Sequence, residues 1–209
     1  MKKVKYNKRG GIITAPDLYL ENICEWPHED FEEVKAVNLE NVGNSLCYDF
    51  PDRENCSLVA LTNILYPQKN NMDISDVYNI VKEVTGRLGY KPEGKRGLSV
   101  FKNHKAITRL VNATGLCGEY KGKWRFLFTT SKGIELLDDG IPFMLSIAYG
   151  SYYNHSITVK GYRVYKNMET GKTYTFLYVN DGWTRDDRFL HWKNKCFHNP
   201  ICLTYMERR

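Results

Sequence analysis

Residues 56–65 carry apolar side chains on nearly every side of a helix drawn at 3.6 residues per turn. The apolar positions are Leu58, Val59, Ala60, Leu61, Ile64 and Leu65. A helix with so little polar surface is buried inside a domain. Asn55 directly before it is a favourable N-cap, because its side-chain oxygen accepts hydrogen bonds from free N–H groups of the first turn. The pattern predicts a central buried helix that begins at Cys56.

Three further helices are predicted from apolar residues at helical spacing. They cover about residues 75–85, 99–114 and 131–138. Gly86 and Gly115 follow the first two directly, and glycine is the residue that most often ends a helix. The first half of the chain from residue 51 is therefore expected to be helical.

From Ile141 onward the apolar positions alternate instead, which predicts strands. The expected strands cover residues 141–149, 155–165, 173–179, 188–192 and 201–206. In the second strand the apolar face changes after Gly161, which predicts a bulge there. Helices followed by strands predict an α+β architecture, with the helical half packed on a C-terminal antiparallel sheet.

Residues 1–50 have a weaker pattern than the rest. Short strand-like segments occur at 12–13, 18–20 and 34–39, and Gly10-Gly11 is expected to be ordinary flexible chain. We predict a single globular domain, with 1–50 as an N-terminal extension on or before a core of 51–209. A hairpin, a clasp over the helical half and a pro-segment all remain open for this region.

Composition narrows the class of protein. The 209 residues are 42% hydrophobic and 26% charged, which is typical of one globular domain. The net charge of +6 is modest, and no basic stripe with interleaved aromatics predicts nucleic-acid binding. No apolar run is long enough for a membrane span and no signal-peptide core is present, so the sequence as written predicts a cytoplasmic protein, with a removed leader left open.

The six cysteines show no repeated spacing, so we expect most of them to be reduced. Cys56 differs from the others because it begins the predicted buried helix. The positive end of a helix favours the thiolate over the thiol, and a thiolate is a nucleophile. From this segment alone, a small buried hydrophobic residue is the favoured interpretation of Cys56.

The predicted hairpin brings a histidine and a carboxylate together. We set its register by pairing Tyr165 with Thr173, which puts His155 opposite Trp183. His155 and Asp181 are then diagonal neighbours on one face, roughly 7–8 Å apart at the backbone. A bulge between these positions shifts the register by one residue. A carboxylate beside an imidazole fixes its tautomer and stabilises the imidazolium.

Three short blocks now carry a resemblance: Cys56 at the helix start, His155 opening a strand that runs into Gly161-Tyr162, and Asn180-Asp181-Gly182-Trp183 closing the next strand. In this order they resemble the signature blocks of papain-like cysteine peptidases. The similarity is nearest to the bacterial branch that includes peptidase domains of double-glycine leader-processing transporters. It extends over about residues 50–195, and residues 136–145 also resemble that branch.

The resemblance implies a papain-like fold and a peptide or protein substrate, with no cofactor and no metal. Cys56 is the implied nucleophile, His155 the general base and then acid, and Asp181 the orienting group, with Asn180 as the fallback. The family has a glutamine six residues before the cysteine as an oxyanion donor, and this chain has Phe50 there. Loss of such a donor typically lowers the rate by a factor of about a hundred or more.

Three functions therefore stay open: a thiol-dependent peptide or amide hydrolase, an acyltransferase or transglutaminase-like enzyme on the same triad, and a papain-like binding module with weak or no catalysis. One other cluster has metal-ligand residue types, namely His191, Cys196, His198 and Cys202. Its spacing is not a standard zinc pattern, so no metal is predicted. The pattern makes no prediction of oligomeric state.

Overall fold

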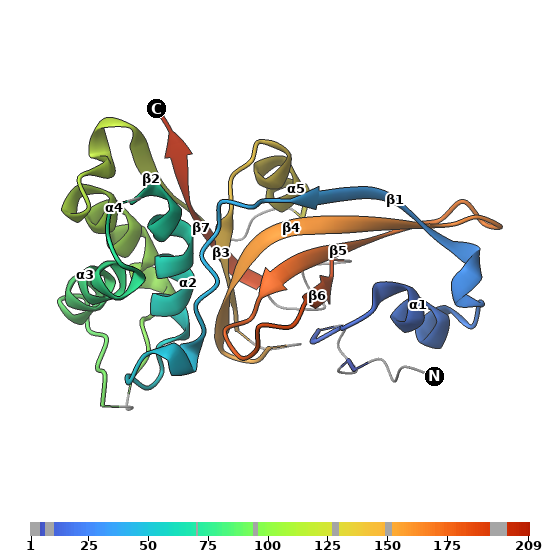
Figure 1. Cartoon of the computed structure of the whole chain (residues 1–209), viewed down its shortest axis with the longest axis horizontal. Helices are drawn as coiled ribbons and strands as arrows, with labels where there is room; N and C mark the ends of the chain where they lie inside the picture. The colour runs from blue at the N-terminus through green and yellow to red at the C-terminus, as the bar shows by residue number, and fades with distance from the viewer. Residues whose placement is uncertain are drawn as a thin grey trace.

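The computed structural model describes residues 5–6, 11–69, 71–93, 96–126, 130–148, 152–192 and 200–209. Figure 1 shows helices gathered at one end of the molecule and a long sheet that extends away from them. The helical end is built from α2 (Cys56–Leu65), α3 (Ile74–Gly86) and α4 (Asn103–Ala113). The α+β architecture predicted from the sequence is confirmed.

The strands are β1 (Phe31–Asn38), β2 (Tyr120–Phe126), β3 (Phe143–Ile147), β4 (His155–Asn167), β5 (Thr173–Asn180), β6 (Arg188–His191) and β7 (Pro200–Arg208). Among the described residues every strand pairing is antiparallel, in the order β2–β7–β3–β4–β5–β6. Strand β1 pairs with the second half of β4, on the edge whose first half pairs with β3. The strand segment predicted at 34–39 is thus part of the sheet.

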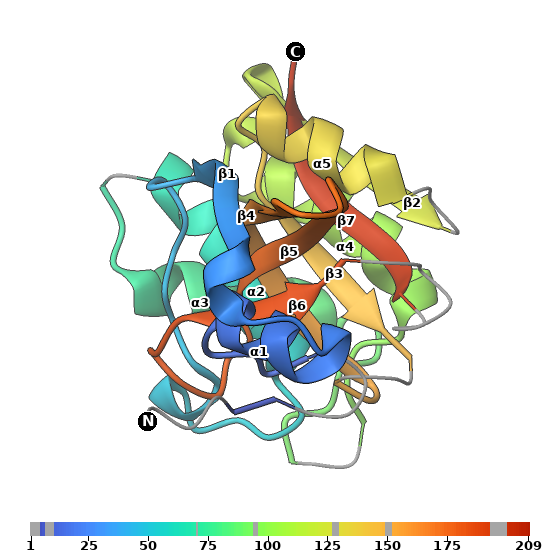
Figure 2. The same ribbon diagram turned by 90° about the vertical axis from the view of Figure 1, so that its right-hand side faces the viewer.

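Two shorter helices cover parts of the sheet, α1 (Pro16–Cys24) and α5 (Thr130–Asp138), with strands between them in Figure 2. Leu136 and Leu137 of α5 join the apolar core built on β3, β4 and β5, while Leu20 of α1 packs against Phe176 and Phe189. Single 3-10 turns connect the elements: η1 (His28–Asp30), η2 (Cys47–Asp49), η3 (Tyr66–Gln68), η4 (Val100–Lys102) and η5 (Leu116–Gly118). In the described part of the chain, none of the helices has the length and apolarity needed to cross a bilayer.

Helix α2 lies in the centre of the helical half and packs on α3, β3 and β4, as its apolar surface predicts. Leu58, Leu61 and Leu65 are completely buried. The predicted N-cap bond of Asn55 is wrong. Its side-chain Nδ2 instead donates to the backbone carbonyl of Cys47 at 2.8 Å, which ties the preceding loop to the helix start.

The β4–β5 register departs from the prediction and then returns to it. Near the hairpin turn Tyr165 pairs with Tyr174, one residue beyond the predicted Thr173. The predicted bulge lies between Val159 and Gly161, and it removes this offset, so that Val159 pairs with Val179 as the original register required. Gly161 is needed here because a Cβ at this position would lie 2.1 Å from a backbone oxygen of β1.

One local prediction is wrong, and one strand was not predicted. Residues 18–20, read as strand-like, belong to helix α1, which has Pro16 in its first turn and a left-handed Glu25 after its end. Strand β2 was not predicted at all, although it pairs with β7 over its whole length. Tyr149 and Gly10 lie outside the described residues, and the division at residue 50 stays a prediction.

Candidate active site

Cys56 and His155 meet where the helical half joins the sheet. Each is the first residue of its element, α2 for the cysteine and β4 for the histidine, and the two elements pack together. Both residues line the same cavity, and the interaction of the His155 imidazole with the Cys56 sulfur shifts the pKa of each group. The histidine is 8% exposed, and the cysteine is half-buried. Two residues 99 positions apart in sequence therefore form one pair.

The pair favours its charged form. Burial by itself raises the pKa of the Cys56 thiol, but the hydrogen bond and the positive charge of His155 outweigh it, helped by the Ser156 backbone N–H and the Ser57 hydroxyl. The pKa of Cys56 is therefore lowered. Burial lowers the pKa of His155, yet its contact with the cysteine and with Asp181 raises the pKa above its usual value. Both shifts favour a thiolate beside an imidazolium.

Asp181 contacts His155 through its backbone and not through its carboxylate. The imidazole Nε2 lies 2.6 Å from the Asp181 carbonyl oxygen. A carbonyl oxygen only accepts, so Nε2 carries a proton and Nδ1 is left for the Cys56 sulfur. The predicted neighbour is therefore present, and the atom that orients the ring is a different one. The carboxylate still raises the pKa of His155 by its charge.

The Asp181 carboxylate is buried, with 1% exposure, and has other partners. Its Oδ1 accepts from the backbone N–H of Trp183 at 2.9 Å, and its Oδ2 lies 3.7 Å from Nε of Arg188 in β6. We call Asp181 and Arg188 together the Asp181–Arg188 pair. Asp181 Oδ2 and the Nε and Nη1 atoms of Arg188 have no hydrogen-bond partner among the described residues.

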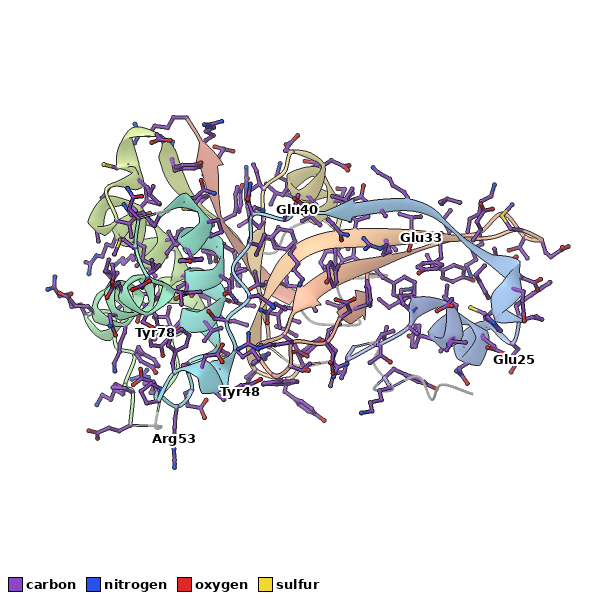
Figure 3. The ribbon with its side chains drawn as sticks, viewed as in Figure 1. Glu25, Glu33, Glu40, Tyr48, Arg53 and Tyr78 are labelled. Carbon is purple, nitrogen blue, oxygen red and sulfur yellow. The ribbon has the colours of Figure 1, made fainter. Side chains whose placement is uncertain are left out.

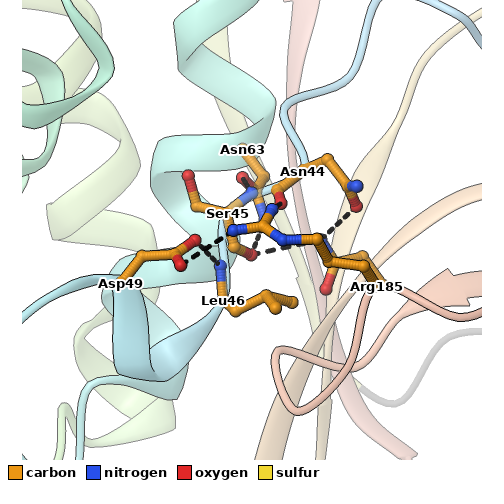
Figure 4. A network of polar contacts seen from close by, with 7 residues as sticks. Asn44, Ser45, Leu46, Asp49, Asn63 and Arg185 are labelled. Carbon is orange, nitrogen blue, oxygen red and sulfur yellow. Dashed lines mark hydrogen bonds and ion pairs between the residues drawn. The ribbon is translucent and has the colours of Figure 1, made fainter.

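Asn180, the fallback residue, holds the backbone instead of the histidine. Its Nδ2 donates to the Ser45 carbonyl at 3.1 Å, and its Oδ1 accepts from the Gly182 N–H at 2.8 Å. Asn63 of α2 clamps the same loop, with Oδ1 accepting from the Ser45 N–H at 2.9 Å (Figure 4). The loop before α2 is thus fixed from both halves of the molecule.

Arg185 closes that loop on its exposed side. It lies 2.9 Å from the Asp49 carboxylate and donates to the Asn44 carbonyl at 3.2 Å, and Figure 4 shows it reaching across from the strand side. The Asp49 carboxylate also accepts from the Leu46 N–H at 2.8 Å. The exposed Tyr48 marks the same loop in Figure 3.

Two aromatic rings form the wall behind His155. Trp183 stacks on the imidazole with centroids 4.4 Å apart, and Tyr152 lies 6.1 Å from the imidazole and 5.5 Å from the indole. Trp183 is 45% exposed, whereas Tyr152 is buried. The indole therefore lies between the histidine and solvent.

Phe50, at the position where the resembling family has glutamine, supplies no polar atom. Its ring stacks on Tyr78 of α3 with centroids 3.7 Å apart, in the helical half where Figure 3 labels that tyrosine. Cys47 lies close to the pair as well. Burial, with the negative charges of Cys56 and Asp181, raises the pKa of Cys47 to about 12, so it stays a neutral thiol.

A cavity of about 320 Å³ opens beside Cys56 and His155. Its lining includes Ser57 from α2, Leu98 and Val100 from the segment before α4, and Ile147 from the end of β3. Such a volume accommodates a side chain or a short peptide segment. Sequence reasoning did not find this cavity, since its walls come from four separate segments of the chain.

The predicted absence of a metal stays a prediction. His191 lies in β6 against Tyr19 and Phe176, and Cys202 lies in β7, two strands that are not neighbours in the sheet. Cys196 and His198 lie outside the described residues. Within the part of the chain that the structure describes, no three His, Cys, Asp or Glu side chains are grouped to bind a metal ion.

Residues 33–200 match the sequence profile of the Peptidase C39-like family. Among solved structures, the chain is similar to a crystal structure of a Bacillus anthracis protein named as a C39-like peptidase. The identity is 12%, the TM-score is 0.49, and the match covers 83% of this chain and 98% of the other. No curated protein sequence matched the chain.

Proposed function

The chain belongs to the Peptidase C39-like family, and on that premise we propose that it is a thiol-dependent hydrolase of a peptide or peptide-like amide. The Cys56–His155 contact is the observation that carries this proposal. It joins a half-buried sulfur at a helix N-terminus to an imidazole that is itself fixed by a backbone carbonyl. That is the arrangement by which a cysteine nucleophile is activated.

The proposed reaction follows from these atoms. The Cys56 thiolate attacks the carbonyl carbon of the scissile amide, and the His155 imidazolium gives its proton to the leaving amine. Water then hydrolyses the thioester, while neutral His155 takes up the proton of that water. The Asp181 carbonyl holds the ring in one tautomer, and the Asp181 carboxylate stabilises the imidazolium by its charge.

Charge on the tetrahedral intermediate needs donors, and the backbone N–H of Cys56 at the start of α2 is one. Phe50 offers none. This favours a second candidate function, a binding module in which the pair is assembled and turnover is slow. The acyltransferase function shares the acyl-enzyme and differs only in the acceptor that resolves it.

The test is the pH dependence of Cys56 alkylation by iodoacetamide, followed by mass spectrometry of the Cys56 peptide. Peptide-level detection is required because other cysteines are free, and the exposed Cys117 is the internal reference thiol. We expect Cys56 to react well below pH 9, the ordinary thiol value, and to lose this reactivity in His155→Ala. Asp181→Asn keeps the backbone carbonyl and removes only the charge, so it should reduce Cys56 reactivity less than His155→Ala does.

A wild-type Cys56 that titrates like an ordinary thiol, with or without His155, contradicts the proposal. If the pair titrates as expected, turnover of a peptide library separates a hydrolase from a binding module. Added amines then separate hydrolysis from acyl transfer, because only a transferase forms the amine adduct as its main product.

A further inference from the structure

Four buried polar side chains from four elements form a continuous line that ends beside Cys56. Asn103 begins α4, Ser146 lies in β3, Ser156 in β4, and Ser57 is the second residue of α2; none is more than 6% exposed. Asn103 Nδ2 lies 3.2 Å from Ser146 Oγ, which lies 3.2 Å from Ser156 Oγ, which in turn lies 3.0 Å from Ser57 Oγ. We call these residues the serine chain.

Taking the Cys56 thiolate as the acceptor for Ser57 sets the direction of every hydrogen bond in the serine chain. An amide N–H can only donate and a thiolate can only accept, whereas each hydroxyl has one proton to give. If Ser57 gives its single proton to the Cys56 sulfur, its hydrogen bond with Ser156 has Ser156 as the donor, and Ser156 in turn accepts from Ser146. This direction agrees with the other end, where the Asn103 amide donates to Ser146. Asn103 Nδ2 also lies 3.4 Å from the Cys202 sulfur, and Asn103 Oδ1 has no hydrogen-bond partner among the described residues.

We propose that the serine chain holds Ser57 as a permanent hydrogen-bond donor to the Cys56 thiolate, so that Ser57 is a positioning residue for the nucleophile. The proposal rests on the proposed function, since it assumes that Cys56 works as a thiolate. Hydrogen bonds to a charged acceptor are stronger than those between neutral groups, and a chain of them strengthens each member. The Ser57 contact accordingly helps to lower the pKa of Cys56.

None of the four members of the serine chain is titratable, so substituting one of them does not change the charge around Cys56. The titratable groups that face Cys56 are His155 on β4, Cys47 in the loop before α2, Tyr90 after α3 and the exposed Glu54 at the cavity rim. Removing a serine hydroxyl changes none of these charges. A shift in the Cys56 titration then reports the lost donor.

The experiment measures the alkylation pH profile of Cys56 in Ser57→Ala, Ser156→Ala and Ser146→Ala. For Ser57→Ala we expect the apparent pKa to rise by about one unit, a tenfold loss of thiolate at a fixed pH below the pKa. The rise should be smaller for Ser156→Ala, which leaves the backbone donor of Ser156 in place, and smaller still for Ser146→Ala. Ser57→Thr keeps the hydroxyl and should restore the wild-type profile.

Thr85→Val is the matched control. Thr85 is fully buried and its hydroxyl bonds its own helix, so this variant loses a buried hydroxyl outside the chain and should leave the Cys56 profile unchanged. If Ser57→Ala does not fold, Ser156→Ala gives the same test without changing α2. A profile that depends on His155 but is the same in all serine variants overturns the serine chain and leaves the proposed function intact. A wild-type Cys56 that titrates as an ordinary thiol overturns both.

Discussion

Two polar clusters flank the Cys56–His155 contact, and they differ in charge and in how fully they are bonded. The serine chain beneath the cysteine is neutral, and its members are joined at 3.0–3.2 Å. The Asp181–Arg188 pair behind the histidine is charged and buried, its ions are 3.7 Å apart, and several of its polar atoms have no hydrogen-bond partner among the described residues.

The difference shows two ways of biasing a proton equilibrium. A neutral chain directs one donor toward the sulfur and adds little electrostatic cost, because its hydroxyl dipoles satisfy one another. A buried ion pair acts over a longer distance but depends on both partners, since either ion alone is left uncompensated in a low-dielectric site. We therefore expect the charged cluster to matter most for folding and the neutral chain to matter most for thiolate chemistry.

The largest effect, a decrease in the free energy of unfolding, is expected for Arg188→Leu. It leaves the Asp181 carboxylate buried without its counter-ion, which typically destabilises a protein by about 3–5 kcal/mol. We expect the low end of that range, because Arg188 Nε and Asp181 Oδ2 are as far as 3.7 Å apart and Asp181 keeps its hydrogen bond from the Trp183 N–H. Urea denaturation followed by circular dichroism measures the free energy of unfolding.

Arg185→Leu is the control for this variant. Arg185 lies closer to its carboxylate, 2.9 Å from Asp49, but its side chain is 57% exposed, so the change should cost less than about 1 kcal/mol. The double variant Arg188→Leu with Asp181→Asn should recover much of the lost stability. If Arg188→Leu and Arg185→Leu lower the free energy of unfolding equally, burial does not determine how much the Asp181–Arg188 pair stabilises the fold.

A second effect concerns the pH range of the reactive pair. The raised pKa of His155 means that its contribution to stability is fully present below its unfolded pKa and is lost as pH rises through its folded pKa. The lowered pKa of Cys56 gives the opposite sign: its contribution is fully present above its unfolded pKa and is lost as pH falls through its folded pKa. Both shifts raise the population of the thiolate–imidazolium form above that of two independent groups.

Hydrolysis of a peptide substrate should accordingly follow a bell-shaped pH profile, and its two limbs belong to the pair as a whole. Ser57→Ala should move the acidic limb upward and leave the alkaline limb nearly in place, because it removes a donor to sulfur alone. Asp181→Asn should move the alkaline limb downward, because it removes a charge that stabilises the imidazolium. If both variants move the same limb, the two clusters do not act on separate partners.

The sequence predicted the elements that carry Cys56 and His155 better than their surroundings. Helix α2 begins at Cys56 and ends at Leu65 as the apolar pattern required, and the parity change at Gly161 correctly located the bulge. These are local signals, contained in ten or twelve consecutive residues. The family match then confirmed the resemblance that the three short blocks had indicated.

The features that the sequence did not predict depend on tertiary packing. Arg188 comes from a strand seven residues beyond Asp181 and draws its carboxylate away from His155, so the backbone carbonyl contacts the ring instead. The serine chain joins four elements separated by up to 99 positions, as from Ser57 to Ser156, and no periodicity reveals it. Strand β2 did leave a signal, the alternation of Tyr120, Gly122, Trp124 and Phe126 with basic residues.

The smallest effect is expected for Trp183→Ala, which removes the ring stacked on His155. Loss of the aromatic face destabilises the charged form of His155 by about 0.5–1 kcal/mol, the usual value for a partly exposed cation–π contact. Water admitted by the same change hydrates the imidazolium and opposes that loss. We expect the pKa of His155 to move by less than about half a unit, measured by NMR titration of its ring protons.

Trp183→Phe, which keeps an aromatic face, is the control and should move the pKa even less. The comparison becomes sharper if Trp183→Ala shifts the Cys56 profile less than Ser57→Ala does, because a partly exposed ring then matters less than a buried neutral donor. A larger shift for Trp183→Ala would mean that the stacked indole, and not the directed hydrogen bonds beneath the cysteine, sets the charge of the pair. Only the half-exposed position of Trp183 argues against that result, since water replaces much of what the ring supplies.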